Sequence, residues 1–325
     1  MTGWSRLISL CVIGCSVATL SPFITAAQEP AEERRPRVEL SAGTWFSVGD
    51  TRWAHNASSV PGLGNPTSKL TYKDVGTTVV DLTAKVWVIP RVFGRLNFGY
   101  AGIGGGRLKD EDFASSGGQH LISSTISNIP DNNMWYLNAD VGGRVTEFPN
   151  HRGYLDLFGG YQYWHTEYQA VGVGTVFCDP TVLICTGSLP PPGQTVITNT
   201  TNWHSIRVGA STEYRLTRRL SVLATLAFIP ASVLDNKDVH HLRGDLSQDP
   251  SFSMVGYGVG ADVDVGARFM ITTNLAANLG YRMYYNRVLS GHLTAHPAVG
   301  STESFPLTQF ESLRHGFTAN LSLIF

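Results

Sequence analysis

The chain has 325 residues and a formal net charge of −1, with 15 % charged residues, 10 % aromatic residues and 34 glycines. A balance this close to neutral gives no electrostatic basis for binding nucleic acid, so we expect no such partner. The length allows one large domain or two ordinary ones. The mean hydropathy of −0.02 does not exclude a membrane protein, because lipid-facing and lumen-facing residues of a transmembrane barrel alternate and cancel in a window average.

The N-terminal segment has the pattern of a secretory signal. Arg6 supplies the positive charge, residues 7–20 form a charge-free and mostly apolar stretch, and small residues suitable for cleavage follow. The apolar stretch is shorter than the ~20 residues that a membrane-spanning helix needs. We therefore expect residues 1–27 to be an export signal, residues 28–37 to be a short tail, and residues 38–325 to form one domain.

Strict alternation of apolar and polar residues recurs along that domain. In the segment 80–88, Val, Leu and Ala residues alternate with Asp, Thr and Lys. The same two-residue period runs through 135–146, 257–269 and 317–325. A period of two over runs this long predicts β-strands that each have one apolar face.

The apolar faces are expected to contact lipid, because the opposite faces carry Asp, Arg, Lys and Asn. Aromatic residues gather near the strand ends, as in the girdles of membrane barrels. They are Trp87, Tyr100, Trp135, Tyr161, Tyr163, Tyr281, Tyr284 and Tyr285. The sequence ends in Phe325, and a terminal aromatic residue is a familiar feature of outer-membrane barrels. Because lipid offers no hydrogen-bond partners, every strand edge must be paired, which requires a closed barrel.

The connections between strands alternate between short and long. The short ones are 89–91, 149–152, 216–219 and 271–274, and the long ones are about 48–68, 108–133, 173–201, 233–251 and 289–307. Five hairpins predict an all-β fold, a transmembrane antiparallel barrel of about ten strands, with short periplasmic turns and long external loops. We therefore expect residues 38–325 to be an outer-membrane β-barrel. A closed barrel needs no partner to cover its edges, so we expect a monomer.

Two cysteines remain after removal of the signal. Cys178 and Cys185 flank a loop-like segment, and a close pair in an exported protein is expected to form a disulfide. The alternative, a metal site, lacks a second pair of ligands nearby. We therefore predict a disulfide that closes this loop.

Two acidic motifs follow strands that lie nearly opposite each other in a ring of ten. Asp110 and Asp112 follow the third predicted strand, and Asp238 and His240 follow the seventh. In an extended segment, residues two apart point the same way. The motifs therefore predict a same-facing carboxylate pair and a same-facing carboxylate–imidazole pair across the barrel mouth.

These four side chains have the chemistry of a hydrolytic site. A carboxylate beside an imidazole raises its basicity, so His240 is expected to deprotonate a water. Two crowded carboxylates resist double ionisation, so one of Asp110 and Asp112 is expected to keep its proton and act as an acid. Solvated loops that merely contain Asp and His remain an alternative. A metal site formed by the four residues together with His241 is another.

The arrangement resembles the omptin family, ten-stranded outer-membrane barrels that cleave peptides on the extracellular side. Omptins carry a D-x-D pair after the third strand and a D-x-H pair after the seventh, which Asp110 and Asp112, and Asp238 and His240, match. Further similarity covers nearly the whole mature chain. It includes residues 41–44, 68–73, 157–168 and 316–325.

The resemblance implies a surface endopeptidase of the aspartic type. Asp238 would orient His240, His240 would activate water, and Asp110 and Asp112 would position the water or assist proton transfer. It implies no cofactor, but a requirement for bound lipopolysaccharide, and a peptide or protein substrate cut at basic residues through acidic pocket groups. At the corresponding pocket positions we consider Asp50 and Asn236, and the latter departs from the acidic pattern.

Two other functions stay open at this point. The barrel would serve as an adhesin or receptor if its loops only bind. It would serve as a small channel if its lumen is open, although polar inward side chains are expected to fill a ring of ten strands. These side chains include Asp81, Lys85, Asp140, Arg144, Asp262, Asp264 and Arg268.

Overall fold

The structure is a computed structural model that describes residues 38–325 except residues 103, 116, 119 and 182–189, and except the side chains of Asp131 and Asn132. The expected export signal and tail, residues 1–37, lie outside the described residues, as does Cys185. Within the described part of the chain, no helix is long and apolar enough to cross a membrane.

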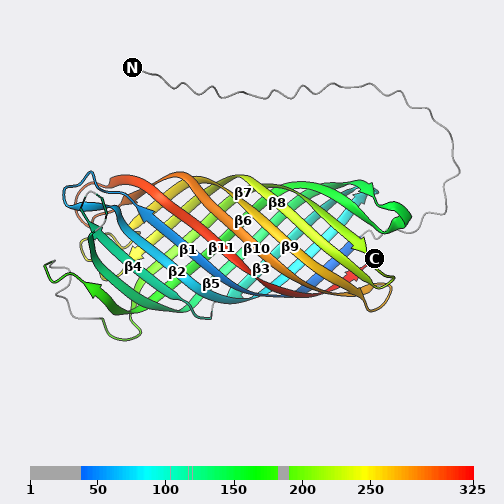
Figure 1. The fold of residues 1–325 in the computed structure, drawn as a ribbon, viewed down its shortest axis with the longest axis horizontal. Helices are drawn as coiled ribbons and strands as arrows, with labels where there is room; N and C mark the ends of the chain where they lie inside the picture. The colour runs from blue at the N-terminus through cyan, green and yellow to red at the C-terminus, as the bar shows by residue number, and fades with distance from the viewer. Residues whose placement is uncertain (1–37, 103, 116, 119, 182–189) are drawn as a thin grey trace, which may run out of the picture. The chain divides into compact units, whose positions relative to one another are not determined.

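The described residues are almost entirely β-strand (Figure 1). One short 3₁₀ helix, η1 (Pro149–His151), lies in a turn. The strands are β1 (Val38–His55), β2 (Leu63–Ile89), β3 (Val92–Gly102), β4 (Arg107–Ala114), β5 (His120–Glu147), β6 (Gly153–Cys178), β7 (Thr195–Arg215), β8 (Leu220–His240), β9 (Phe252–Met270), β10 (Leu275–Ala295) and β11 (Glu303–Ile324).

The strands close into a ring of antiparallel neighbours. Apart from β3 and β4, each strand pairs with the next along the chain, and β1 pairs with both β2 and β11. Strands β3 and β4 occupy successive parts of one position between β2 and β5, so the ring of eleven strands has ten positions. The seam ends in two hydrogen bonds between Val38 and Phe325, with N–O distances of 2.9 and 3.3 Å. The predicted all-β barrel of about ten strands is confirmed.

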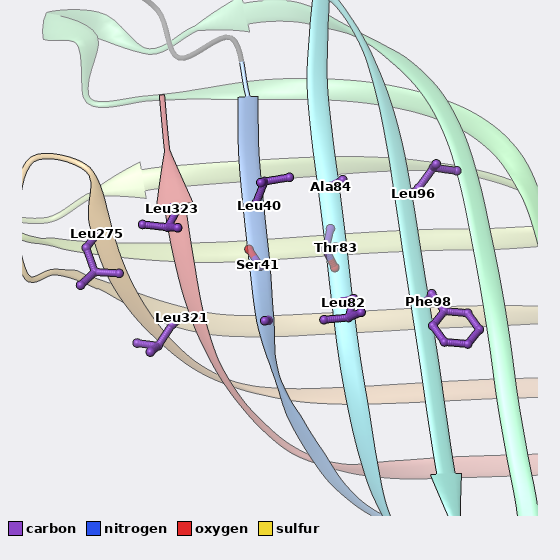
Figure 2. A pocket seen from close by; sticks show the side chains of 11 residues that line it. Leu40, Ser41, Leu82, Thr83, Ala84, Leu96, Phe98, Leu275, Leu321 and Leu323 are labelled. Carbon is purple, nitrogen blue, oxygen red and sulfur yellow. The ribbon is translucent and has the colours of Figure 1, made fainter.

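The outer surface carries the apolar residues of the alternating pattern. Val141, Leu279 and Phe317 are 67 %, 67 % and 69 % exposed, as lipid-facing side chains of a barrel are. Figure 2 shows part of this band, a shallow apolar hollow on β1, β2, β3, β10 and β11 that is lined mainly by leucines. The expected aromatic girdle is wrong at two positions. Trp87 alternates with exposed Val86 and Val88, and Tyr284 is buried, so both rings point inward.

Ion pairs fill the interior at the level of the apolar band. Asp156 is buried between Lys85 and Arg144, with N–O distances of 2.8 and 2.9 Å. Other pairs join Arg95 to Asp140, Arg282 to Asp81 and Asp264, and Arg268 to Glu39 and Glu213. The inward-facing charges predicted from the sequence therefore compensate one another inside the barrel.

The strands continue well beyond the bilayer on the side away from Val38 and Phe325. They reach 27 residues in β2 and 28 in β5, whereas ~9–11 residues cross a membrane. This extension has its own apolar interior, in which Trp53, Leu70, Leu108, Trp203 and Phe310 are fully buried. In Figure 1, β4 lies toward this end and the C-terminus marks the other.

The structure corrects the expected limits of the long loops. Neighbouring strands keep their hydrogen bonds around the apolar interior, so the connections shrink to 56–62, 115–119, 179–194, 241–251 and 296–302. The short turns lie where the sequence predicts them. As a result, both acidic motifs lie on strands and not in loops.

Candidate active site

The two motifs reach the same end of the barrel from different walls. Asp110 and Asp112 lie on β4 and share the inward face with buried Leu108. Asp238 and His240 end β8 and share the inward face with buried Leu234 and Asn236. Alternation along each strand therefore turns all four side chains toward the interior of the barrel mouth.

Asp238 and His240 form a hydrogen-bonded dyad. Oδ2 of Asp238 lies 2.9 Å from Nε2 of His240. The second oxygen of Asp238 accepts a hydrogen bond of 3.0 Å from the Asn199 amide, and the backbone N–H of His240 donates to Oγ of Ser251 at 3.0 Å. Asp238 is fully buried, whereas 13 % of the His240 side chain is exposed. The protein thus holds Asp238 away from solvent, while the imidazole of His240 remains accessible from the barrel mouth.

The electrostatic surroundings make His240 more basic than an ordinary histidine. Burial alone lowers the pKa of an imidazole, but the charge and hydrogen bond of Asp238 outweigh it and raise the pKa of His240 above its ordinary value of 6.5, and Asp110 adds to this rise when it is ionised. Nearby Arg243 opposes this rise. A raised pKa increases the proton affinity of the neutral ring, as a general base requires.

The opposite pair contains a carboxyl group with a raised pKa. Burial and the charge of Asp112 raise the pKa of Asp110 to about 8, with a further contribution from Asp238, while His240 acts in the opposite direction. Oγ of Ser123 donates a hydrogen bond of 2.8 Å to Asp112, and Oγ of Ser68 lies 3.5 Å from Asp110. The raised pKa favours the protonated form of Asp110, the form in which a carboxyl group can donate a proton.

The charges of the two pairs act on one another across the mouth. Asp110 responds to both members of the dyad, and Arg243, from the loop after β8, interacts with both Asp110 and Asp112. No hydrogen bond between the two pairs is found in the described residues. Nor do the described His, Cys, Asp and Glu side chains form a group of three or more that could hold a metal ion.

Several residues at the site carry no signal in the sequence. Asn199, Ser123 and Ser251 support the pairs from neighbouring strands, and only the strand register brings them there. His55 on β1 is buried and lies within the electrostatic reach of His240. Arg243 lies in a connection and pairs with Asp245.

The structure corrects the expectation for Asp50 as a pocket residue. Asp50 lies between Gly49 and Thr51, which are buried, so its side chain is on the outer face. Its carboxylate accepts the backbone N–H of Asp74 at 3.0 Å and lies 3.7 Å from Arg52. It therefore supplies no negative charge to the interior.

Asn236, the other pocket position, does lie on the inward face below Asp238. Its amide N–H groups donate to Asn199, to the carbonyl oxygen of Thr200 and to Thr201, at 2.9–3.0 Å. Its oxygen accepts from Asn199 at 3.3 Å. The hydrogen-bonding groups of this amide are therefore used within the protein, and Asn236 forms part of the bottom of the opening, which we call the floor.

The remaining predicted residues lie outside this cluster. His241 is exposed and its Nε2 lies 2.9 Å from the hydroxyl of Thr198. Cys178, at the end of β6, is disulfide-bonded. Because Cys185 lies outside the described residues, the pairing between these two cysteines stays a prediction.

Comparisons with known proteins bear on the fold. No protein-family model matches the sequence, and a search of curated proteins finds no match. Among solved structures, the outer membrane protease OmpT from Escherichia coli is similar, with a TM-score of 0.71, 15 % sequence identity, and coverage of 89 % of this chain and 96 % of that chain.

Two further solved barrels are more distant. The translocator domain of the autotransporter NalP from Neisseria meningitidis has a TM-score of 0.37 and 10 % identity, covering 90 % of each chain. A FadL homologue from Pseudomonas aeruginosa has a TM-score of 0.31 and 9 % identity, covering 88 % of this chain and 90 % of that chain. The chain thus has an omptin-like outer-membrane β-barrel fold, and its apolar outer band is the surface that this location requires.

Proposed function

We propose that this barrel is a surface endopeptidase that hydrolyses peptide bonds with a water activated by the Asp238–His240 dyad. One arrangement carries the proposal. A basic imidazole, held by a buried carboxylate, faces a carboxyl pair in which burial and the charge of Asp112 raise the pKa of Asp110 to about 8. A base and an acid at neutral pH on opposite walls of one opening are the two groups that amide hydrolysis needs.

The reaction divides between the two walls. His240 takes a proton from water, and the resulting hydroxide adds to the carbonyl carbon of the peptide bond. Asp238 stabilises the imidazolium that forms. When the carbon–nitrogen bond breaks, Asp110 donates its proton to the leaving amine, and the proton held by His240 returns to the acid pair through solvent. Each turnover consumes one water and yields one carboxylic acid and one amine.

The interior of the barrel disfavours a channel. Asp156 with its two cations and Asp140 with Arg95 are buried at membrane level, and such closely paired charges occupy the lumen. An adhesin or receptor would need no acid and base of matched pKa, so the chemistry of the mouth favours the enzyme over a binder.

The test is peptide hydrolysis by the refolded full chain in detergent with added lipopolysaccharide. Quenched fluorescent peptides of varied sequence are offered to the wild type, to His240→Ala and to His241→Ala. We expect cleavage that falls by about 10²–10⁴ in His240→Ala, as for loss of a general base. Cleavage by His241→Ala stays close to wild type, because that imidazole is exposed and outside the dyad. If the wild type hydrolyses no peptide, the proposal fails and a role as an adhesin or receptor is favoured.

A further inference from the structure

Aromatic rings line the wall that joins the two catalytic pairs. The ring of Phe252 lies 5.1 Å from that of His240 and 6.4 Å from that of His55. The ring of Phe305 lies 6.1 Å from that of His55. Phe252 and Phe305 are only partly buried, so their rings remain accessible beside the dyad. We call His55, Phe252 and Phe305 the aromatic wall.

Strand register explains why this wall runs from one pair to the other. Asp238 on β8 is opposite Phe252 on β9, and Leu293 on β10 is opposite Phe305 on β11. His55 on β1 is opposite Leu307 on β11, and on its other side opposite Ser68. Ser68 in turn is opposite Asp112. Paired residues share a face, so inward-facing apolar residues bridge the distance between His240 and Asp112.

The aromatic wall carries no charge at neutral pH. Burial and the neighbouring His240 lower the pKa of His55 to about 4, so its imidazole stays neutral. Nδ1 of His55 is buried without a hydrogen-bond partner among the described residues. A neutral ring packed against Trp53 at 6.1 Å behaves as part of an apolar surface.

The floor beside the wall also lacks a free carboxylate. The buried inward positions next to the dyad are Asn236 and Thr201, and Thr51 is the buried position on β1. Arg243 already places a cation at the opening, where it pairs with Asp245 at 2.6 Å. Glu303 is exposed at the rim of β11. Among the described residues around the aromatic wall, a substrate cation therefore meets no buried anion outside the catalytic pairs.

We propose that the aromatic wall is the subsite for a substrate side chain next to the bond that is cut, and that it takes an uncharged aromatic or large aliphatic residue. This inference rests on the proposed peptidase function and specifies its substrate class. A peptide lying across the mouth between the dyad and the acid pair would place one side chain against Phe252 and Phe305. An apolar side chain gains by burial there, whereas Lys or Arg would lose hydration without gaining an ion pair.

The test is the cleavage profile of the refolded full chain with lipopolysaccharide on a peptide library, with cut sites read by mass spectrometry. We expect enrichment of Phe, Tyr, Trp, Leu and Met beside the cut bond. Enrichment of Lys and Arg overturns this inference and leaves the peptidase standing. Absence of any cleavage above the His240→Ala background overturns both.

Variants test which residues determine the preference for an apolar side chain. Phe305→Ala is expected to lower kcat/KM for a Phe-containing peptide by about tenfold or more, with Phe317→Ala, on the lipid-facing side, as its matched control. His55→Asp adds a carboxylate to the wall and is expected to raise the ratio of Lys to Phe cleavage by about tenfold or more. Glu303→Gln is expected to leave that ratio unchanged. Unchanged ratios in both wall variants, with folded protein, overturn the assignment.

Discussion

Asp238 and His240 lie two residues apart on one strand, and their side chains are joined by a hydrogen bond of 2.9 Å. Because alternate residues of a strand share a face, the carboxylate lies directly beneath the imidazole and is sealed from solvent while the ring is partly open. A sequence spacing of two thus positions the base and its supporting charge with no contribution from a loop.

The charge of Asp238 is expected to matter more than its size. Asp238→Asn keeps the shape of the side chain but removes the charge that stabilises the imidazolium, so kcat should fall by about 10²–10⁴. Asp235→Asn is the matched control, because Asp235 lies on the same strand with the opposite parity. Steady-state hydrolysis of one good peptide measures both. Equal losses in the two variants would contradict the role of the dyad.

The activity is expected to have a bell-shaped pH dependence. His240 must be neutral to accept a proton, so kcat/KM rises with pH through its pKa in the free protein, which lies above 6.5. Asp110 must be protonated to act as an acid, so kcat/KM falls as the pH passes about 8. In Asp110→Asn the basic limb should disappear, because an amide does not titrate, and the maximal rate should drop. A basic limb that persists in this variant would show that another group titrates.

Asn199 is expected to be a positioning residue for Asp238. Its amide donates a hydrogen bond of 3.0 Å to the carboxylate, and hydrogen bonds to charged groups contribute about 1.5–3 kcal/mol. Asn199→Ala should therefore lower kcat by about 10–100-fold and shift the acid limb of the pH profile, while KM changes little. A variant with lower activity but an unmoved acid limb would indicate a purely structural role.

The buried ion pairs are expected to dominate the stability of the lower barrel. Asp156→Asn leaves Lys85 and Arg144 without their buried counter-charge, and breaking a buried pair in this way costs about 3–5 kcal/mol. Asp74→Asn, which breaks an exposed contact of 3.5 Å with Arg107, should cost less than about 1 kcal/mol. Urea unfolding of the refolded barrel measures both. Equal costs would contradict the importance of burial.

The barrel could be predicted from sequence because its signal is repeated many times. A period of two in four long segments predicts both the element type and the lipid-facing side, and the alternation of short and long connections predicts the strand number. The loop limits were wrong because the apolar interior around Trp53 and Phe310 keeps the strands paired above the bilayer. Trp87 and Tyr284 point inward and not into the expected outer girdle, because the presence of an aromatic residue near a strand end does not show which face of the strand carries it.

The site could be predicted only where local spacing carries it. Asp110 with Asp112, and Asp238 with His240, are pairs within single strands, so the two-residue rule applies. Asn199, Ser123 and the aromatic wall come from other strands, and only the register places them. Asp50 illustrates the limit of this reasoning. Its side chain has suitable chemistry for a pocket, but it lies one position away from the inward-facing residues Gly49 and Thr51 and therefore points to the outside of the barrel.

The seam between Val38 and Phe325 has a consequence for assembly. Strand β1 pairs with β2 on one side and with β11, the last strand of the chain, on the other. Until β11 is in place, the backbone N–H and C=O groups along one edge of β1 and one edge of β10 have no strand partner. Insertion of a chain that lacks β11 is therefore unfavourable, because the free edges of β1 and β10 would meet lipid without hydrogen-bond partners. A chain shortened before β11 is expected not to form a stable barrel in a membrane.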